Sequence, residues 1–217
     1  NGTYVIDALT SNVFTFREQV HAAYIQFRSF TGDKEKPSWK YDVGLRGEQV
    51  WNNGQAATNN VSFSNNYFNL FPTANISYYK TPDEFWKLSY SRRINRPGLG
   101  QLNPFIDITD SLNKHGGNPY LKPELVHSLE WGYNKEWPKL SVYTTLFYRN
   151  ATNTIRQFTV LFPNGVALTQ PVNIGNATTY GLENIIIARP FHKYDVNLSL
   201  SFFQQHINGT NLDKAAV

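Results

Sequence analysis

The sequence predicts an all-β protein of about eight long antiparallel strands, and three observations lead to this fold class. Apolar and polar residues alternate with a period of two through most of the chain, as they do along strands whose two faces meet different surroundings. No helix is predicted, although residues 14–29 could be strand or helix by composition alone. Short links rich in Pro, Gly, Asn and Asp separate the alternating segments, and such clusters are typical of turns.

Three of the strands are predicted before residue 80. Residues 14–29 form the first, although both of its faces are nearly equally apolar. Residues 39–48 show the clearest alternation in the chain, and residues 70–78 repeat it. The charged segment 31–37 reads as a short turn. Residues 52–66 are rich in Asn, Ser and Ala, and are therefore predicted to be a loop.

The rest of the chain supplies five further strands. They are predicted at residues 85–92, 125–133, 140–162, a return strand that ends at 188, and 194–202. Pro163-Asn164-Gly165 provides the hairpin signal between the third and fourth of these.

The links between strands differ in length in a way that favours a membrane barrel. Short links are predicted at residues 31–37, 81–84, 135–138 and 190–193, and long ones at 53–66 and 93–122. Short turns on one rim and longer loops on the other are typical of outer-membrane barrels, although the tight link at 163–165 breaks this pattern. A link as long as 93–122 without its own periodicity is usually functional or disordered.

Aromatic residues make up 15% of the chain and gather beside the short links. An aromatic belt at a membrane interface would place them there; they are Trp39, Phe85, Trp86, Trp137, Phe191 and Tyr194. In a soluble sandwich the same side chains would form the core. Alternation alone does not say which face is wet, but most strands approach the 9–11 residues that cross a bilayer, whereas strands in globular proteins are nearer five or six.

Composition excludes several classes of protein. Charged residues are 17% of the chain and the formal net charge of +4 is spread along it, which disfavours a nucleic-acid partner. There is no cysteine, and therefore no disulfide framework or thiolate zinc site. No run of 18 apolar residues predicts a transmembrane helix. The chain has no Met and begins with Asn, which predicts a processed or excised piece of a longer product.

Catalytic chemistry is not indicated. None of the five histidines is paired at a metal-ligand spacing, and no GxSxG, GxxxxGK or GxGxxG motif with the required context occurs. We therefore expect no enzyme, no catalytic residue, no metal site and no cofactor.

Three segments of the 93–122 region and its borders carry a family resemblance. They are YSRR at 90–93 followed by Arg96-Pro97, LNPF at 102–105, and GNPYLKPE at 117–124. In this order they resemble the barrel of TonB-dependent outer-membrane receptors, in the form found in Bacteroidetes-type bacteria. The combined motif is long and ordered, and it decides between the membrane barrel and the soluble sheet.

The resemblance implies an outer-membrane receptor that imports a scarce nutrient with energy from the TonB system. It also implies a barrel of about 22 strands filled by an N-terminal plug domain. Residues 1–217 show neither a plug nor a TonB box, and their ending KAAV is not the family's terminal aromatic strand. We therefore expect one barrel domain that covers roughly a third of the full barrel.

The partners implied are outer-membrane lipid, the receptor's own plug and TonB system through the missing part of the chain, a surface lipoprotein, and a small nutrient ligand. A glycan, a peptide and a metal chelate all remain open as ligands.

Two groups of residues are candidates for the site. Residues expected to face the lumen or the plug are Arg46, Glu48, Arg92, Arg93, Arg96 and Glu130. The arginines contact either an anionic ligand or plug, or lumen carboxylates such as Glu124 and Glu130; the second reading is favoured because a buried arginine needs a carboxylate. Candidate ligand contacts in or near the loops are Tyr67, Asn103, Phe105 and Tyr120, with loop packing as the alternative role.

Two other functions stay open at this point. Eight strands can close into a small barrel, which would have a structural or adhesion role. A soluble carbohydrate-binding β-sandwich is the second alternative.

Overall fold

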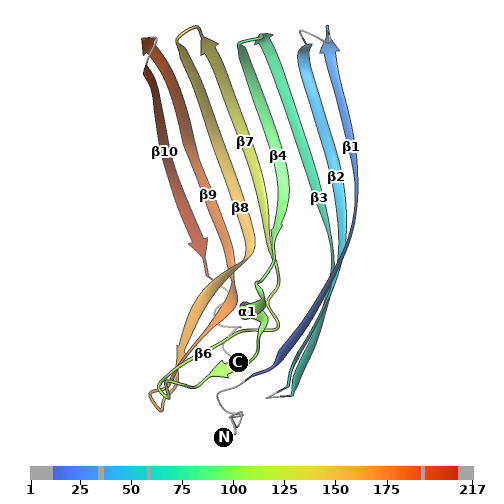
Figure 1. Ribbon diagram of the computed structural model, residues 1–217, viewed down its shortest axis with the longest axis vertical. Helices are drawn as coiled ribbons and strands as arrows, with labels where there is room; N and C mark the ends of the chain where they lie inside the picture. Colours follow the sequence, from blue (N-terminus) through green and yellow to red (C-terminus); the bar gives the residue numbers. More distant parts are fainter. Residues whose placement is uncertain (1–11, 34–36, 58–59, 192–193, 210–217) are drawn as a thin grey trace, which may run out of the picture.

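The computed structural model describes residues 12–33, 37–57, 60–191 and 194–209. Eight long strands form an antiparallel sheet (Figure 1): β1 (Phe14–Gly32), β2 (Pro37–Ala56), β3 (Val61–Thr81), β4 (Glu84–Asn95), β7 (Glu124–Trp137), β8 (Leu140–Leu161), β9 (Ala167–Phe191) and β10 (Tyr194–Asn208). The region between β4 and β7 adds a single helical turn and two short strands, α1 (Leu99–Leu102), β5 (Ile106–Asp107) and β6 (Asn113–Gly116). The predicted all-β fold and the eight long strands are confirmed.

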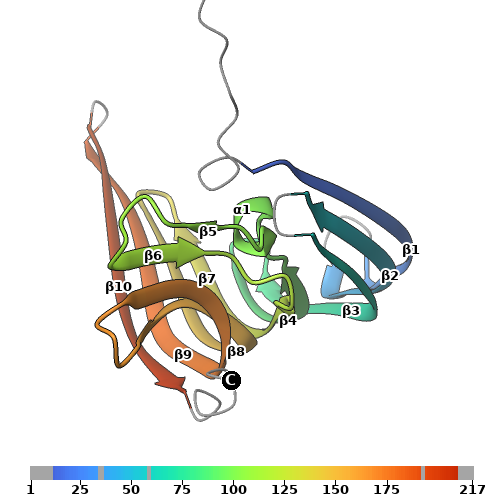
Figure 2. The same cartoon turned by 90° about the horizontal axis from the view of Figure 1, so that it is seen from below.

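The sheet is curved into an open trough. Figure 2 shows the strands following one another along an arc, with α1, β5 and β6 lying on its concave side. Within the described residues, β1 pairs only with β2, and β10 only with β9. The eight long strands therefore do not close on themselves, and one sheet does not make a sandwich, so neither alternative architecture is formed.

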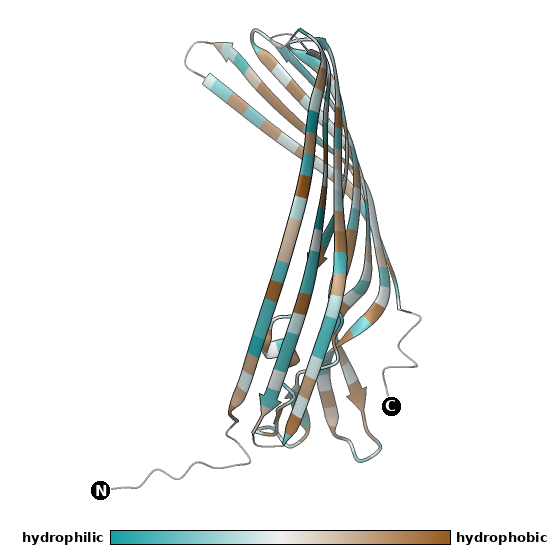
Figure 3. Ribbon diagram, turned by 90° about the vertical axis from the view of Figure 1, so that its right-hand side faces the viewer, coloured by the Kyte–Doolittle hydropathy of each residue, from teal (hydrophilic) through white to brown (hydrophobic). Residues whose placement is uncertain are grey.

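One face of the sheet is apolar and carries an aromatic row near the short links. The strand register places Trp39, Tyr78, Trp86 and Tyr133 side by side on four neighbouring strands. Their ring centroids are 4.8, 5.8 and 5.3 Å apart in that order. Figure 3 shows brown and teal bands alternating along the strands, as expected when one face meets lipid.

The predicted aromatic belt needs one correction. Phe85 lies on the opposite, concave face, where its ring stacks on Tyr79 at a centroid distance of 4.9 Å. Phe85 precedes Trp86 directly, and neighbouring residues of a strand point to opposite faces. The position of Phe85 beside the turn therefore did not indicate which face of the sheet its side chain lies on.

The predicted loop at 52–66 is wrong, because β2 and β3 run through it. Their register is unbroken from Trp39↔Tyr78 to Ala56↔Val61, which leaves residues 57–60 as the link. Phe63 lies over Gly54, where a Cβ atom would be 2.3 Å from the ring. The polar composition that suggested a loop belongs to a hairpin that continues as paired strands on the loop side of the apolar band.

The other links are closer to expectation. The hairpin at 163–165 is confirmed, since β8 ends at Leu161 and β9 begins at Ala167. Strand β6 reaches the same end of the molecule and pairs in parallel with the start of β9. Among the described residues, no helix is long and apolar enough to cross a membrane.

Strands β3 and β4 separate before the loop begins. Their pairing ends at Thr73↔Ser91, while β4 stays paired with β7 as far as Asn95↔Glu124. Residues 61–72 of β3 stay paired with β2 on one side but face the loop on the other side, where β4 would otherwise pair. The site described next lies there.

Candidate ligand-binding site at the loop end of the sheet

The segment between β4 and β7, residues 96–123, is the long loop, and its motif segments pack against one another. The Gly117 amide donates to the Asn103 carbonyl at 3.1 Å, and the Asn118 amide donates to the Gln101 carbonyl at 2.6 Å. A Cβ atom at Gly117 would lie 2.4 Å from the Asn103 oxygen. Only glycine permits this approach, so the LNPF and GNPYLKPE segments form one unit.

A small apolar core fixes this unit to the sheet. Leu102 and Leu121 are 2% and 4% exposed, and they pack with Phe63 of β3 and Ile155 of β8. Phe14 and Phe16 of β1 cover the same cluster. The loop thereby joins β1, β3 and β8, none of which are direct neighbours in the sheet.

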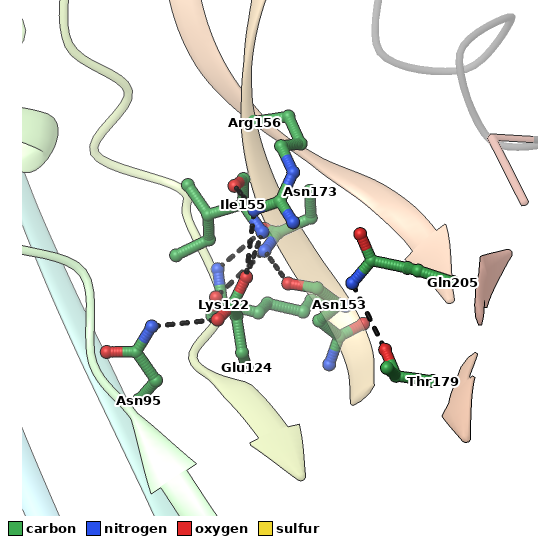
Figure 4. Close-up of polar contacts among 9 residues, drawn as sticks. All are labelled: Asn95, Lys122, Glu124, Asn153, Ile155, Arg156, Asn173, Thr179 and Gln205. Carbon is green, nitrogen blue, oxygen red and sulfur yellow. Dashed lines mark hydrogen bonds and ion pairs between the residues drawn. The ribbon is translucent and has the colours of Figure 1, made fainter. Parts of the chain in front are cut away.

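Polar contacts hold the end of the loop in place, as Figure 4 shows. The buried Glu124 carboxylate accepts from the Asn95 side chain at 2.8 Å and from the Ile155 amide at 2.5 Å. The Asn173 side chain accepts from the Lys122 amide at 2.8 Å and donates to the Lys122 carbonyl at 2.9 Å. These contacts anchor the last motif segment to β4, β8 and β9.

Two more amide side chains bridge the loop and the strands on either side of it. Asn65 of β3 donates to the Pro119 carbonyl at 3.0 Å, and Asn118 donates to the Pro171 carbonyl of β9 at 3.2 Å. Pro119 is itself buried. The loop is therefore bound across the concave side from β3 to β9.

Two of the four predicted ligand contacts line one pocket. Tyr67 and Tyr120 border a cavity of about 560 Å³ between β3 and the loop. Tyr120 is 74% exposed. The rest of the lining is mixed, with the polar residues Asn52, Ser64, Asn65, Asn66, Lys122 and Asn153 and the apolar residues Pro97, Leu102, Leu121, Pro123 and Leu125.

The other two predicted contacts are placed differently. Asn103 accepts hydrogen bonds from the Asn12 side chain at 2.9 Å and from the Phe105 amide at 3.2 Å, so it serves the packing of the loop. Phe105 is half-buried in the loop, and neither residue lines the pocket.

The predicted charged residues form a second cluster, above the loop. Glu48 is 4% exposed and forms ion pairs with Arg46, at 2.5 Å, and with Arg96 at the start of the loop. Arg92 donates to the Leu70 carbonyl at 2.9 Å, and so bridges the place where β4 leaves β3. Arg93 is exposed and lines a pocket with Arg46.

Arg96 pairs with a carboxylate of the concave face, as expected, but the two carboxylates named as examples have other partners. Glu124 lies 4.0 Å from Arg156, and Glu130 lies 3.4 Å from Arg149. The carboxylate that anchors the loop base is Glu48, which is 48 positions from Arg96 in the chain. Glu130 shares the concave face with Glu48 and Arg93 by strand register.

Sequence reasoning missed Phe63 and Asn173 as anchors of the loop. Phe63 had a signal, because a glycine on a neighbouring strand makes room for a large side chain. Asn173 had none, since its partners at Lys122 and Asn153 follow only from the folded register.

The tip of the loop is ordered by two aspartates. Hydrogen bonds from the side chain and the backbone amide of Thr109 hold the pKa of Asp107 below its usual value. Asn113 and the amide of Leu112 lower the pKa of Asp110 in the same way. Within the described residues, no group of three His, Cys, Asp or Glu side chains is placed to hold a metal ion.

Solved structures share this fold. The copper transporter OprC is 13% identical, with a TM-score of 0.70 over 89% of this chain and 30% of that one. The FrpB iron transporter from Neisseria meningitidis is 16% identical, with a TM-score of 0.64 over 91% and 27%. The siderophore receptor PirA from Pseudomonas aeruginosa is 14% identical, with a TM-score of 0.61 over 88% and 44%. The chain spans less than half the length of each.

No curated protein matches the sequence. A sequence profile of the outer membrane protein beta-barrel family matches residues 1–216. The match covers nearly the whole chain and agrees with the fold, the apolar face and the resemblance to TonB-dependent receptor barrels. The chain therefore belongs to the outer membrane protein beta-barrel family and lies in the bacterial outer membrane.

Proposed function

We propose that this chain is part of the barrel of a receptor that binds a small nutrient at the cell surface and imports it with energy from the TonB system. The observation that carries the proposal is the long loop, which is seated on the concave side and borders a pocket with Tyr67 and Tyr120. A loop held on the inner side of a barrel wall narrows the opening that a ligand must pass.

The work of such a receptor is binding and gating, without bond chemistry. The loop end of the sheet faces the outside, because longer loops of outer-membrane barrels are extracellular. The exposed Tyr120 ring contacts the ligand, and the amides around it supply hydrogen bonds. The charged residues of the concave face contact the plug. No enzyme activity, cofactor or nucleic-acid partner is part of this proposal.

The rest of the receptor follows the family pattern. The proposal includes a barrel of about 22 strands, a plug and TonB box outside this chain, a surface lipoprotein as a possible partner, and a Bacteroidetes-type origin. The similar solved structures are a copper transporter, an iron transporter and a siderophore receptor, which supports a metal chelate as one ligand class. Glycans and peptides are tested as the two other ligand classes.

Two experiments test the proposal. The intact mass of the native protein from outer membranes should be several times 24.9 kDa; a mass near that value would contradict the larger receptor. Cells with the full receptor should take up one of the three ligand classes only when TonB is present. Tyr120→Ala should weaken binding of that ligand about tenfold, the loss typical of an aromatic contact.

The matched control is Phe162→Ala. Phe162 is also an exposed aromatic residue at the loop end, but it does not line the Tyr120 pocket. Equal losses in both variants, or uptake that continues without TonB, would contradict the proposed function.

A further inference from the structure

Four arginines, Arg46, Arg92, Arg93 and Arg96, lie close to Glu48 and to the place where β4 leaves β3. Only Arg46 and Arg96 pair with Glu48, and together with Arg92 and Arg93 these five side chains carry a formal charge of +3. A second carboxylate, Glu18, lies on the same face opposite Asn52. Elsewhere on the concave face the arginines are paired: Arg28 with Asp42 at 3.4 Å, and Arg149 with Glu130 at 3.4 Å.

The four arginines have different contacts. Arg96 pairs with the buried Glu48 and holds the base of the loop. Arg92 is bound to neutral acceptors, the Leu70 carbonyl and the Asn69 side chain at 3.4 Å. Their Nε atoms are buried without an acceptor among the described residues. Arg92 and Arg96 are therefore engaged in contacts within the structure and are not available to a ligand.

Arg46 and Arg93 remain available to a ligand. The Arg46 side chain is 53% exposed although it touches Glu48. Arg93 is exposed and forms no ion pair or side-chain hydrogen bond with the described residues. Because Arg96 also binds Glu48, that carboxylate does not neutralise Arg46 fully.

Arg46 and Arg93 line one cavity of about 580 Å³. Tyr24 and Gln26 of β1 form one side of it, and both carry polar groups that can donate hydrogen bonds. Gly44 and Thr73 also line it, together with apolar side chains that include Ile25, Leu45, Phe71 and Ile94. A volume of this size is in the range of small-molecule sites.

We propose that Arg46 and Arg93 together bind a carboxylate group in this cavity. Arginine presents a planar fork of donors that matches the two oxygens of a carboxylate. The carboxylate belongs either to an anionic solute or to an acidic side chain of the receptor outside this chain. The proposal rests on the proposed function, because it takes the concave face to be the inside of a receptor barrel.

The test uses the full receptor in detergent and reads binding and stability instead of uptake, so its failure is distinct from failure of the proposed function. Citrate serves as the carboxylate probe in a low-salt titration. Arg93→Gln removes a guanidinium that has no described partner. Arg149→Gln is the control, since it removes the same charge from the same face at an arginine that is already paired.

For a solute carboxylate, Arg93→Gln weakens citrate binding about tenfold or more, the loss of one charge-assisted hydrogen bond, and Arg149→Gln does not. If the carboxylate is an acidic side chain of the receptor, Arg93→Gln lowers the melting temperature more than Arg149→Gln does. In that case the titration shows no citrate binding to the unmodified receptor. The proposal is overturned if Arg93→Gln changes neither quantity, or if both variants weaken citrate equally.

Discussion

The two ends of this sheet are stabilised in different ways. At the short-link end, the aromatic row of Trp39, Tyr78, Trp86 and Tyr133 lies on the apolar face that meets lipid. At the loop end, Leu102 and Leu121 form a small core that is buried without lipid.

This difference shows that the motif segments of residues 90–124 stabilise the loop end of the sheet. An aromatic belt depends on the membrane interface, whereas the loop end is held by internal packing and by hydrogen bonds to Glu124 and Asn173. The motif segments are thus explained by anchoring the loop. The proposed function assigns ligand contact to Tyr67 of β3 and to the exposed Tyr120, which lies within the GNPYLKPE segment.

The strongest way to break the loop end is to remove its core. Leu121→Ala should destabilise the seated loop by about 3 kcal/mol, because it leaves a cavity among Leu102, Phe63 and Ile155. Limited proteolysis of the full receptor should then cut within residues 96–123. Leu99→Ala is the control, since Leu99 is 56% exposed in the same loop. Equal cleavage of both variants would count against a loop core.

The next largest effect is expected at Glu124. Glu124→Ala leaves the Ile155 amide and the Asn95 side chain without their acceptor, and should cost about 2 kcal/mol. Hydrogen exchange at Ile155 should accelerate. Glu183→Ala is a control on the concave face, and unchanged exchange at Ile155 in the Glu124 variant would show that the carboxylate is not an anchor.

At the other end, Trp86→Leu should cost about 1 kcal/mol, since it removes ring contacts with Tyr78 and Tyr133. Urea unfolding of the receptor in lipid vesicles measures this cost. Protease resistance of the long loop should stay as it is. A variant that loosened the loop would show that the two ends are not independent.

The smallest effect is a pH dependence at the loop tip. The pKa values of Asp107 and Asp110 are lowered in the folded loop. Their contribution is therefore fully present above the unfolded value of about 3.9 and is lost as the pH falls through the lower folded values. The protection of the Leu112 amide, taken relative to its intrinsic exchange rate at each pH, should fall only in that acidic range, and Asp110→Asn should remove this pH dependence. Protection that is lost already near neutral pH would contradict the assignment.

The comparison also explains what the sequence could predict. Alternation is a local property, so the eight long strands were visible, and the ordered motif revealed the family. The loop at 52–66 was mispredicted because Asn and Ser were taken as turn residues, whereas they lie on paired strands beyond the apolar band.

Contacts between distant residues were not predictable in the same way. The pairing of Glu48 with Arg96 depends on β4 leaving β3 after Ser91, and no local pattern reports that separation. Of the candidate ligand contacts, Tyr67 and Tyr120 share a pocket, whereas Asn103 packs inside the loop. Composition alone did not distinguish a loop residue that faces a cavity from one that fills the loop.

The measurement that tests the account most directly is hydrogen exchange of the full receptor in detergent, followed at the amides of Gly117, Asn118 and Lys122. The first two amides donate the hydrogen bonds that hold the loop segments together, and the Lys122 amide donates the one that joins the loop to Asn173 of β9. The account predicts exchange as slow as in the paired strands β7 and β8. Exchange as fast as at the exposed loop tip would show that the loop is not a fixed part of the barrel's inner side.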